Sequence, residues 1–503
     1  MNQWRIAGLI LAAVFAAWLT LRGCSPEEED RPAPAPVRDQ FHASKPLAVV
    51  AAYATAAGNQ ADLAWLEREL RYLLMRGQMR IAAQQPGSQP IYTLRVELDH
   101  APPTAATLRL LAPDGVVERT LQVQLGEPAL ATMRSLAGAL PAFLGAAHTT
   151  TDWATLLGTD DSSAYENFLR SSNELLDANG RGFTRPGAAA NSATVDRLEA
   201  LTRRHPRFAR AWSLLSVAYL NLGGKDQASL TQLADTTAER ALGLDPALTD
   251  AQSAQGLARL RRGEWTAALE HFNTALKVDA NSSPALEGLA CLLVDVGHST
   301  AALPIAQRAV ALQPGSIGAN ECLVYAQLGT ATDVPPPAKQ SEPLAVAQVR
   351  ALNALLSARP AEAEGFLRAA SNTSNASQWV DPLLRAATNR QQTSEALQAI
   401  TRAASDNVID PVTEVISGAA LRQSDFVFNR MLRLHKQHEQ LPLRILWLPD
   451  TAFLRQHRRF AEIVTAAGLP AFWQDHGLPD ICAHEPAVFG CKLKSQPAAK
   501  SPD

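Results

Sequence analysis

The sequence is poor in cysteine, in aromatic residues and in net charge. Five cysteines among 503 residues are too few for a fold built on disulfides, and their spacing does not match a zinc finger. Aromatic residues make up only 6% of the chain, while alanine and leucine recur throughout, which favours close-packed helices over a β-sandwich. A net charge of -3 provides no basic surface for nucleic acid.

Long apolar runs are also scarce, which excludes a transporter with many membrane spans. The exception is residues 6–21, IAGLILAAVFAAWLTL, between Arg5 and Arg22. This run is slightly shorter than the ~20 residues that cross a bilayer, but flanking side chains can extend its reach. Residues 22–44 form an acidic and then Pro-Ala-rich linker. A basic residue before the apolar run and acidic residues after it predict that residues 1–5 are cytoplasmic and that the body of the chain is exported.

Three interpretations of the apolar run remain open: an uncleaved membrane anchor, a lipoprotein signal, or a cleaved secretory signal. The segment Leu21-Arg22-Gly23-Cys24 resembles a bacterial lipobox, in which Cys24 would carry the lipid. Arg22 departs from that pattern, because the residue before the glycine is normally small or aliphatic. We expect the anchor, since no small-x-small cleavage site follows the run.

Residues 45–147 are expected to form a small α/β domain. Apolar and polar residues alternate from Ile91 to His100, which is typical of a strand with one solvated face. Pro113-Asp114-Gly115 marks a hairpin turn between two further strands, and leucines at helical spacing predict helices over 62–75 and 130–144. The predicted element order is β-α-β-β-β-β-α.

Helical repeats are the strongest pattern in the chain. Pro246, Ala280 and Pro314 follow three predicted helices at intervals of 34 residues, the period of tetratricopeptide helix pairs. Small and aromatic residues recur at matching positions, where neighbouring helices must approach closely. The residues assigned to this packing are Trp212, Leu215, Tyr219, Gly256, Ala268, Phe272, Ala275, Ala302, Ala306 and Ala309.

We assign four repeat units to residues 160–326, the last represented mainly by its first helix. Residues 345–503 continue as degenerate helical pairs and a cysteine-containing tail. The predicted fold class is therefore mainly α: a tetratricopeptide-type solenoid preceded by a small α/β domain and an N-terminal membrane helix. The concave surface of the repeats is the expected binding surface.

No arrangement of residues points to catalysis. The chain has no Gly-x-Ser-x-Gly elbow, no His-Glu-x-x-His helix and no phosphate-binding loop. His435 and His438 share a helix face but lack a third ligand nearby, and Glu67 and Glu69 are spaced for a solvated helix face. We therefore expect neither an enzyme nor a bound cofactor or metal.

The tail carries a family resemblance. In order, it contains Trp447, Pro449, Leu454-Arg455, Arg459-Phe460, Gly468-Leu469, Trp473, Pro479-Asp480-Ile481-Cys482 and Cys491. This pattern is similar to the end of the periplasmic region of CadC-like bacterial membrane regulators. The segment from Ala164 to Arg170 also resembles the start of the repeat region in that family.

This resemblance implies a TolB-amino-terminal-like α/β domain and tetratricopeptide repeats in the periplasm, behind one inner-membrane helix. Family members also carry a cytoplasmic winged-helix domain that binds DNA. Because five residues precede the apolar run, we expect no such domain here and no nucleic-acid partner.

Two pairs of cysteines remain to be assigned. Cys482 and Cys491 are expected to form a disulfide in an oxidising compartment. A zinc site with His476 and His484, or free thiols, are the alternatives. Cys291 and Cys322 lie in apolar helical segments and are expected to be buried small hydrophobic residues.

The function expected from these features is that of a membrane-anchored, periplasm-facing scaffold or adaptor. It would bind a protein or peptide of the bacterial envelope. The alternative is a sensory component of a transmembrane signalling or regulatory pathway whose output passes through a separate protein.

Overall fold

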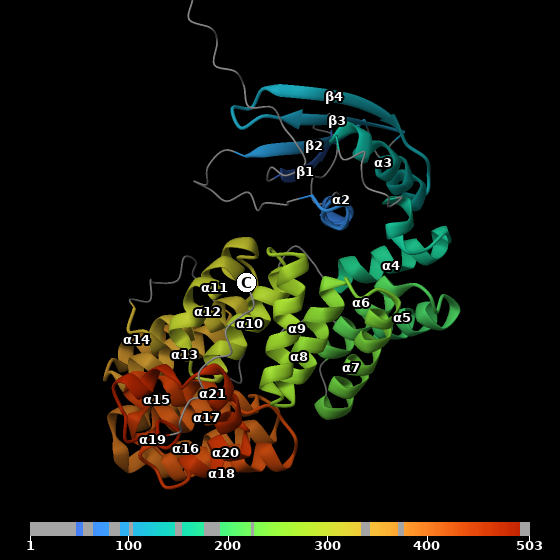
Figure 1. Cartoon of the computed structure of the whole chain (residues 1–503). Helices are drawn as coiled ribbons and strands as arrows, with labels where there is room; N and C mark the ends of the chain where they lie inside the picture. The colour runs from blue at the N-terminus through green and yellow to red at the C-terminus, as the bar shows by residue number, and fades with distance from the viewer. Residues whose placement is uncertain are drawn as a thin grey trace, which may run out of the picture. The chain divides into compact units, whose positions relative to one another are not determined.

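The computed structural model describes residues 47–53, 64–79, 91–99, 104–145, 153–175, 192–222, 226–332, 343–370 and 377–492 (Figure 1). The expected membrane helix over 6–21, the linker over 22–44 and Cys24 lie outside these residues. Among the residues that the structure describes, no helix is both long and apolar enough to cross a membrane.

A four-stranded sheet forms the first part of the described chain. The strands β1 (Leu47–Tyr53), β2 (Tyr92–Leu98), β3 (Ala105–Leu111) and β4 (Val117–Gln124) follow one another in chain order across the sheet. β1 and β2 are parallel, with helix α2 (Ala64–Arg76) between them in the chain, and the other two pairs are antiparallel. Helix α3 (Ala129–Phe143) follows β4. Five strands were expected, so the predicted order contained one strand more than the described residues form.

The sheet is buried on one face, as the alternation in β2 predicts. Leu94, Val96 and Leu98 are buried, while Arg95 and Glu97 point to the opposite face and form an ion pair at 3.0 Å. Val96 lies opposite the buried Leu108 of β3. The period of two therefore places the apolar residues of neighbouring strands on the same face.

Antiparallel helix pairs follow the sheet. The structure contains α4 (Ser162–Leu175), α5 (Ser192–Arg204), α6 (Ala209–Asn221), α7 (Gln227–Leu244), α8 (Thr249–Arg261), α9 (Trp265–Val278), α10 (Ser283–Asp295), α11 (Ser299–Leu312) and α12 (Ile317–Gly329). The first helices α8, α10 and α12 begin at Thr249, Ser283 and Ile317, at intervals of 34 residues. Four complete pairs precede α12, so the expected count of four units, the last incomplete, was one pair short.

Phe272 explains why small residues recur in these pairs. Its ring is fully buried and lies against Gly256 of α8 and Gly288 of α10. A Cβ atom added to these glycines would lie 2.7 Å and 2.3 Å from a ring carbon, far inside normal carbon contact. Because the two glycines have no side chains, the ring fits between the neighbouring first helices α8 and α10.

The other residues assigned to repeat packing are also buried, except one. Leu215 and Tyr219 of α6 are buried, as are Ala268, Ala275, Ala302, Ala306 and Ala309 of the second helices. Trp212 is partly buried and packs on a cluster of Ala241, Leu248 and Ala251. Its ring N–H donates to the carbonyl of Pro206 at 3.1 Å.

Helices follow one another as far as His476. They are α13 (Leu344–Leu356), α14 (Pro360–Ala370), α15 (Ser377–Thr388), α16 (Thr393–Ser405), α17 (Pro411–Ala420), α18 (Ser424–Lys436) and the short α19 (Ala452–Arg455), α20 (Phe460–Ala466) and α21 (Leu469–His476). Consecutive helices from α13 to α18 pack against each other. The short 3-10 helix η4 (Leu443–Trp447) opens the tail.

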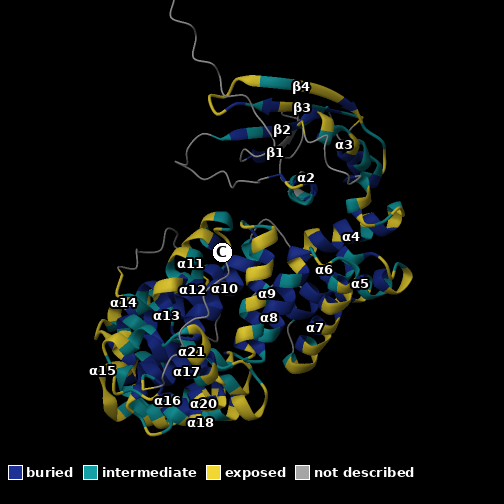
Figure 2. Ribbon diagram, in the orientation of Figure 1, coloured by how far each residue is buried: buried dark blue, intermediate teal, exposed yellow. Residues whose placement is uncertain are grey.

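First and second helices differ in burial (Figure 2). Every residue of α10 from Ala285 to Asp295 is buried, whereas α9 and α11 each bury four residues along one side. A helix buried all round is a core helix, and one with a single apolar stripe faces solvent on its other side. The exposed surface of the repeats therefore belongs mainly to the second helices.

Candidate functional site: buried polar clusters and the exposed repeat surface

Three indole hydrogen bonds hold the tail against the end of α10 and the start of α9. The indole N–H of Trp447 donates to the carbonyl of Asp295 at 2.8 Å, and that of Trp473 donates to the carbonyl of Val296 at 2.9 Å. In the opposite sense, Trp265 of α9 donates to the carbonyl of Ala467 in the tail at 2.6 Å. These bonds satisfy carbonyls of the turn and tail that burial would otherwise leave unpaired.

Asp480 adds a helix cap supplied from a distant part of the chain. Its carboxylate accepts from the backbone N–H of Thr300, in the first turn of α11, at 2.7 Å. Its own N–H donates to the carbonyl of Gly297 at 2.9 Å. An acidic side chain is favourable at a helix N-terminus because it pairs with an orphan N–H and with the helix dipole.

Several residues of the tail pattern lie in its interior. Leu454, Phe460 and Trp473 are buried, and so is the side chain of Arg455. Arg455 donates to the carbonyls of Leu446 and Leu448 and pairs with the carboxylate of Glu485. Their positions show that these residues hold the tail together and dock it on the repeats.

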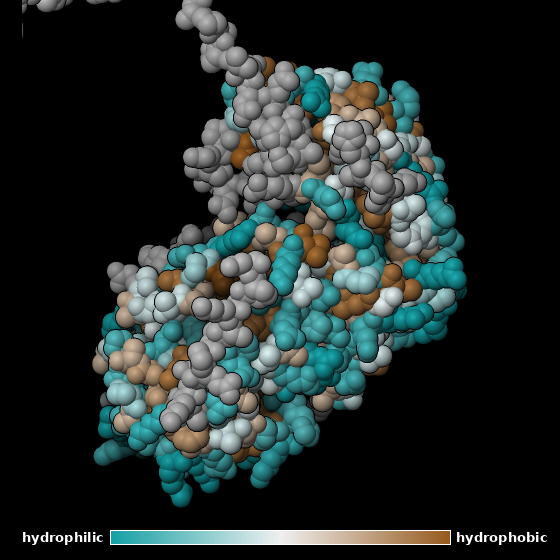
Figure 3. All heavy atoms as spheres, in the orientation of Figure 1, coloured by the Kyte–Doolittle hydropathy of each residue, from teal (hydrophilic) through white to brown (hydrophobic). Residues whose placement is uncertain are grey.

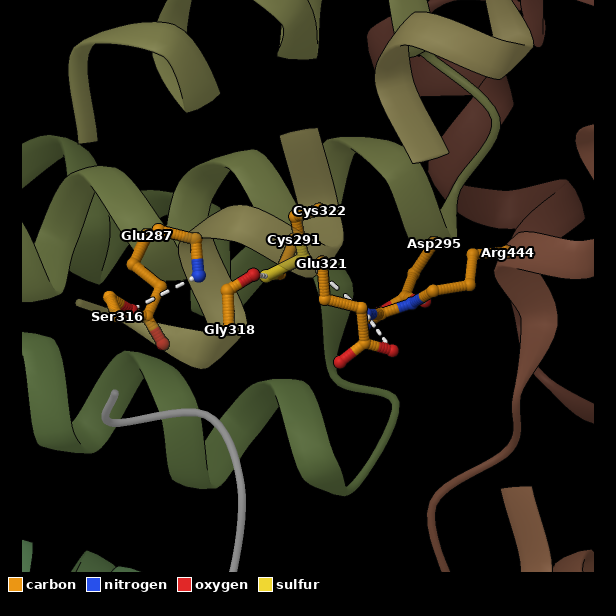
Figure 4. Close-up of a disulfide and its surroundings, with 9 residues drawn as sticks. Glu287, Cys291, Asp295, Ser316, Gly318, Glu321, Cys322 and Arg444 are labelled. Atoms are coloured by element: carbon orange, nitrogen blue, oxygen red, sulfur yellow. Dashed lines mark hydrogen bonds and ion pairs between the residues drawn. A yellow bond between two sulfur atoms is a disulfide. The ribbon is translucent and has the colours of Figure 1, made fainter. Parts of the chain in front are cut away.

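A charged cluster joins the tail to α10 and α12 (Figure 4). The guanidinium of Arg444 makes two bonds to the carboxylate of Asp295, at 2.8 Å and 3.0 Å, and lies 3.5 Å from Glu321. Burial raises the pKa of Asp295 despite the nearby Arg444, and the two carboxylates raise the pKa of Arg444. The chain's own tail therefore covers part of the surface of the first helices α10 and α12.

A buried disulfide lies in the same region. Cys291 of α10 and Cys322 of α12 are joined, with their Cα atoms 5.3 Å apart (Figure 4). Both cysteines are buried, as expected, but they are bonded to each other, which the expectation of small hydrophobic residues did not include. Equivalent residues of α10 and α12 are 34 apart, whereas the two cysteines are separated by 31, so they are offset by one helical turn. This offset places their side chains together across two neighbouring first helices.

The structure also joins Cys482 and Cys491, with their Cα atoms 5.2 Å apart. This disulfide closes a short loop in the tail, two residues after Asp480 and its cap on α11. His476 lies instead beside Thr266, 3.3 Å from its hydroxyl. No group of three or more His, Cys, Asp or Glu side chains arranged for a metal occurs in the described ranges. His435 and His438 are both exposed.

A second charged cluster connects α2, next to the sheet, with the first repeat helices. Glu69 is 1% exposed, which corrects the expectation of a solvated face. Both of its oxygens accept from Arg210 of α6, at 2.7 Å and 2.8 Å, and Tyr165 of α4 donates to it at 2.5 Å. Burial alone would raise the pKa of Glu69, but Arg210 and Tyr165 hold it below its ordinary value.

Aromatic rings complete the surroundings of Arg210. The guanidinium lies 4.0 Å from the ring centre of Tyr72 and 4.6 Å from that of Phe168. A further ion pair, between Arg76 of α2 and Asp245 after α7, spans 2.7 Å. Sequence reasoning missed this cluster, because Glu69 and Arg210 are 141 residues apart and belong to no local motif.

A cavity of about 70 Å³ lies beside this cluster. Arg68, Tyr72, Arg210, Ser213, Leu248 and Asp250 are among the residues that line it. It is too small for a drug-sized ligand, which needs a pocket of roughly 300 Å³ or more. Its size and the few polar groups in its mostly apolar lining suit water or a ligand of a few atoms.

The described structure defines a class of protein: helix pairs stacked at a 34-residue period behind a small α/β sheet. No protein-family model matches the chain, and a search of curated proteins finds no match. Among solved structures, the chain is similar to a chain in the structure of Naa15/Naa10 bound to HypK-THB. The two are 14% identical, with a TM-score of 0.24, over 64% of this chain and 48% of that chain. The chain thus matches about half the length of that protein, and so loose a similarity supports no conclusion about fold or function.

Proposed function

We propose that the chain is a protein-binding scaffold, held at the bacterial inner membrane through residues 6–21, with its helical repeats in the periplasm. The observation that carries the proposal is the stack of helix pairs. In repeat arrays of this kind each helix pair contacts only its neighbours. Stacked pairs therefore form an extended surface that is suited to binding another protein.

The compartment is supported by the cysteines. Four of the five cysteines form the disulfides Cys291–Cys322 and Cys482–Cys491. Disulfides persist in oxidising compartments and are rare in the cytosol. This agrees with the charge order around the apolar run, which independently favours export of the body.

The contact surface that we propose is the exposed side of the second helices. Leu233 of α7 is 46% exposed and Val278 of α9 is 41% exposed, among few large hydrophobic residues with this much exposure in the described chain. The helices around them are largely hydrophilic in the view of Figure 3. A reversible interface is as a whole about as apolar as the rest of a protein surface, so a mostly polar face with a few exposed apolar side chains is compatible with such a contact.

Co-purification with charged variants tests this surface. Leu233→Lys and Val278→Lys, combined in the full-length chain, are expected to lower the recovery of an envelope partner severalfold. The fold should survive, because both side chains are exposed. Thr465→Lys, at an exposed position of α20, is the matched control and should leave recovery unchanged. Equal recovery with all three proteins would exclude the second helices as the contact surface.

A further inference from the structure

The cavity beside Arg210 contains polar groups that the protein itself does not satisfy. Within the described ranges, neither the hydroxyl of Ser213 nor the Nε–H of Arg68 has a hydrogen-bond partner. Ser213 is only 4% exposed, and both residues line the cavity. A buried donor without a partner is costly, so these two groups are positioned for an acceptor that enters from outside the chain.

The start of helix α8 reaches the same cavity. Leu248 occupies its N-cap position and offers no side-chain acceptor, and Leu248, Thr249 and Asp250 all line the cavity. Uncapped first-turn N–H groups and the helix dipole favour a negatively charged group nearby. The N-terminus of α8 and the two unsatisfied donors therefore both favour a negatively charged oxygen acceptor.

The charged side chains around the cavity place a second requirement on the ligand. Arg210 is already paired with Glu69 through two hydrogen bonds. That leaves Arg68, whose other hydrogen bond goes to the neutral side chain of Asn173, and the carboxylate of Asp250 in the cavity wall. Burial raises the pKa of Asp250 despite the nearby Arg210 and Arg68. A simple anion would be attracted by Arg68 and repelled by Asp250, whereas a ligand that carries both charges would be attracted by both.

We propose that this cavity binds a small zwitterion, an α-amino acid of the size of glycine or alanine. Its carboxylate accepts from Ser213 and Arg68, and its ammonium group faces Asp250. A water molecule needs about 10–15 Å³ of such a cavity, so about 70 Å³ accommodates roughly six non-hydrogen atoms. The aliphatic side chain of Leu248 and the ring of Tyr72 form apolar walls around that volume.

Equilibrium dialysis of radiolabelled glycine and alanine against the purified full-length chain tests the proposal. Both should bind saturably, and leucine should not, because its side chain exceeds the cavity. Acetate and methylamine each carry one of the two charges, so each should bind at least roughly tenfold more weakly than glycine. No saturable binding of glycine or alanine at millimolar concentration would show that the cavity holds only water.

Two variants locate the ligand. Ser213→Ala removes an unsatisfied hydroxyl, so the protein should fold normally while glycine binding weakens by roughly tenfold or more. Asp250→Asn should weaken glycine binding and leave acetate binding unchanged or stronger. Ser216→Ala, one turn along α6, is the control: its hydroxyl bonds to the carbonyl of Ala234 at 2.7 Å, away from the ligand, and affinity should not change. Unchanged glycine affinity in Ser213→Ala and Asp250→Asn would overturn the proposal.

Discussion

Replacing Gly288 with alanine should destabilise the repeats, although alanine is the better helix former. The gain in helix propensity is about 1 kcal/mol. Against it, the added Cβ would lie 2.3 Å from one carbon of the Phe272 ring and 2.4 Å from another, where carbon contacts normally begin near 3.5 Å. The ring has little room to move toward α8, because a Cβ added at Gly256 on that side would also lie within 2.7 Å of it. Overpacking of this kind costs about 1–3 kcal/mol, and contacts this short belong at the upper end of that range, so we expect a net loss of up to about 2 kcal/mol.

A double-mutant cycle separates the clash from other effects. Phe272→Ala alone should cost about 3–5 kcal/mol, because the ring is fully buried. In that background the clash is gone, so Gly288→Ala should become neutral or stabilising. The coupling energy between the two sites should therefore reach at least about 1 kcal/mol.

Hydrogen exchange on peptides from α8, α9 and α10 is the appropriate assay. It reports local opening free energies and does not require the long chain to unfold in one step. Gly365→Ala in α14 is the matched control: nothing lies within 4 Å of its added Cβ, so its own helix should gain up to about 1 kcal/mol. If Gly288→Ala instead increased the protection of α10 as much as Gly365→Ala increases that of α14, the placement of Phe272 between two glycines would be refuted.

Two further predictions concern the polar clusters. Glu69→Gln leaves the buried Arg210 without its charged partner and should cost about 3 kcal/mol at neutral pH by thermal unfolding. Because the pKa of Glu69 is lowered in the folded protein, its contribution is present above about pH 4.5 and is lost as the pH falls below it; the variant should show a flatter acid limb, and an unchanged limb would contradict the assignment. Removing the buried disulfide with Cys291→Ala and Cys322→Ala should lower stability by about 2–5 kcal/mol, and peptide mapping of acid-trapped, non-reduced protein should find these two cysteines linked. Recovery of Cys291 and Cys322 as free thiols from cells would rule the disulfide out.

The helix pairs and the buried face of the sheet can be predicted from the sequence, because the residue patterns that determine them are local and periodic. Gly256, Ala268, Phe272 and Ala275 stand out at helical spacing within one repeat period, and the structure places all four in the packed interior. The alternating residues of β2 predict the buried face of the sheet in the same way. In each case the pattern of a single segment already contains the packing constraint.

The polar clusters could not be predicted from the sequence, because each depends on residues that are far apart in the chain. Arg444 meets Asp295 across 149 residues, and neither residue differs by local pattern from a solvated charge. Glu69 was expected to face water for the same reason. The Cys291–Cys322 disulfide was missed because its offset from the repeat period becomes meaningful only once α10 and α12 are known to be neighbours.

The central claim, a protein-binding repeat surface outside the cytoplasm, is tested most directly by photo-crosslinking in living cells. A photoreactive amino acid is placed in turn at Leu233, at Val278 and, as a control, at Thr465, and the adducts are identified by mass spectrometry. Leu233 and Val278 should capture the same envelope protein, and Thr465 should not. Adducts with cytoplasmic proteins, or equal capture at all three positions, would contradict the claim.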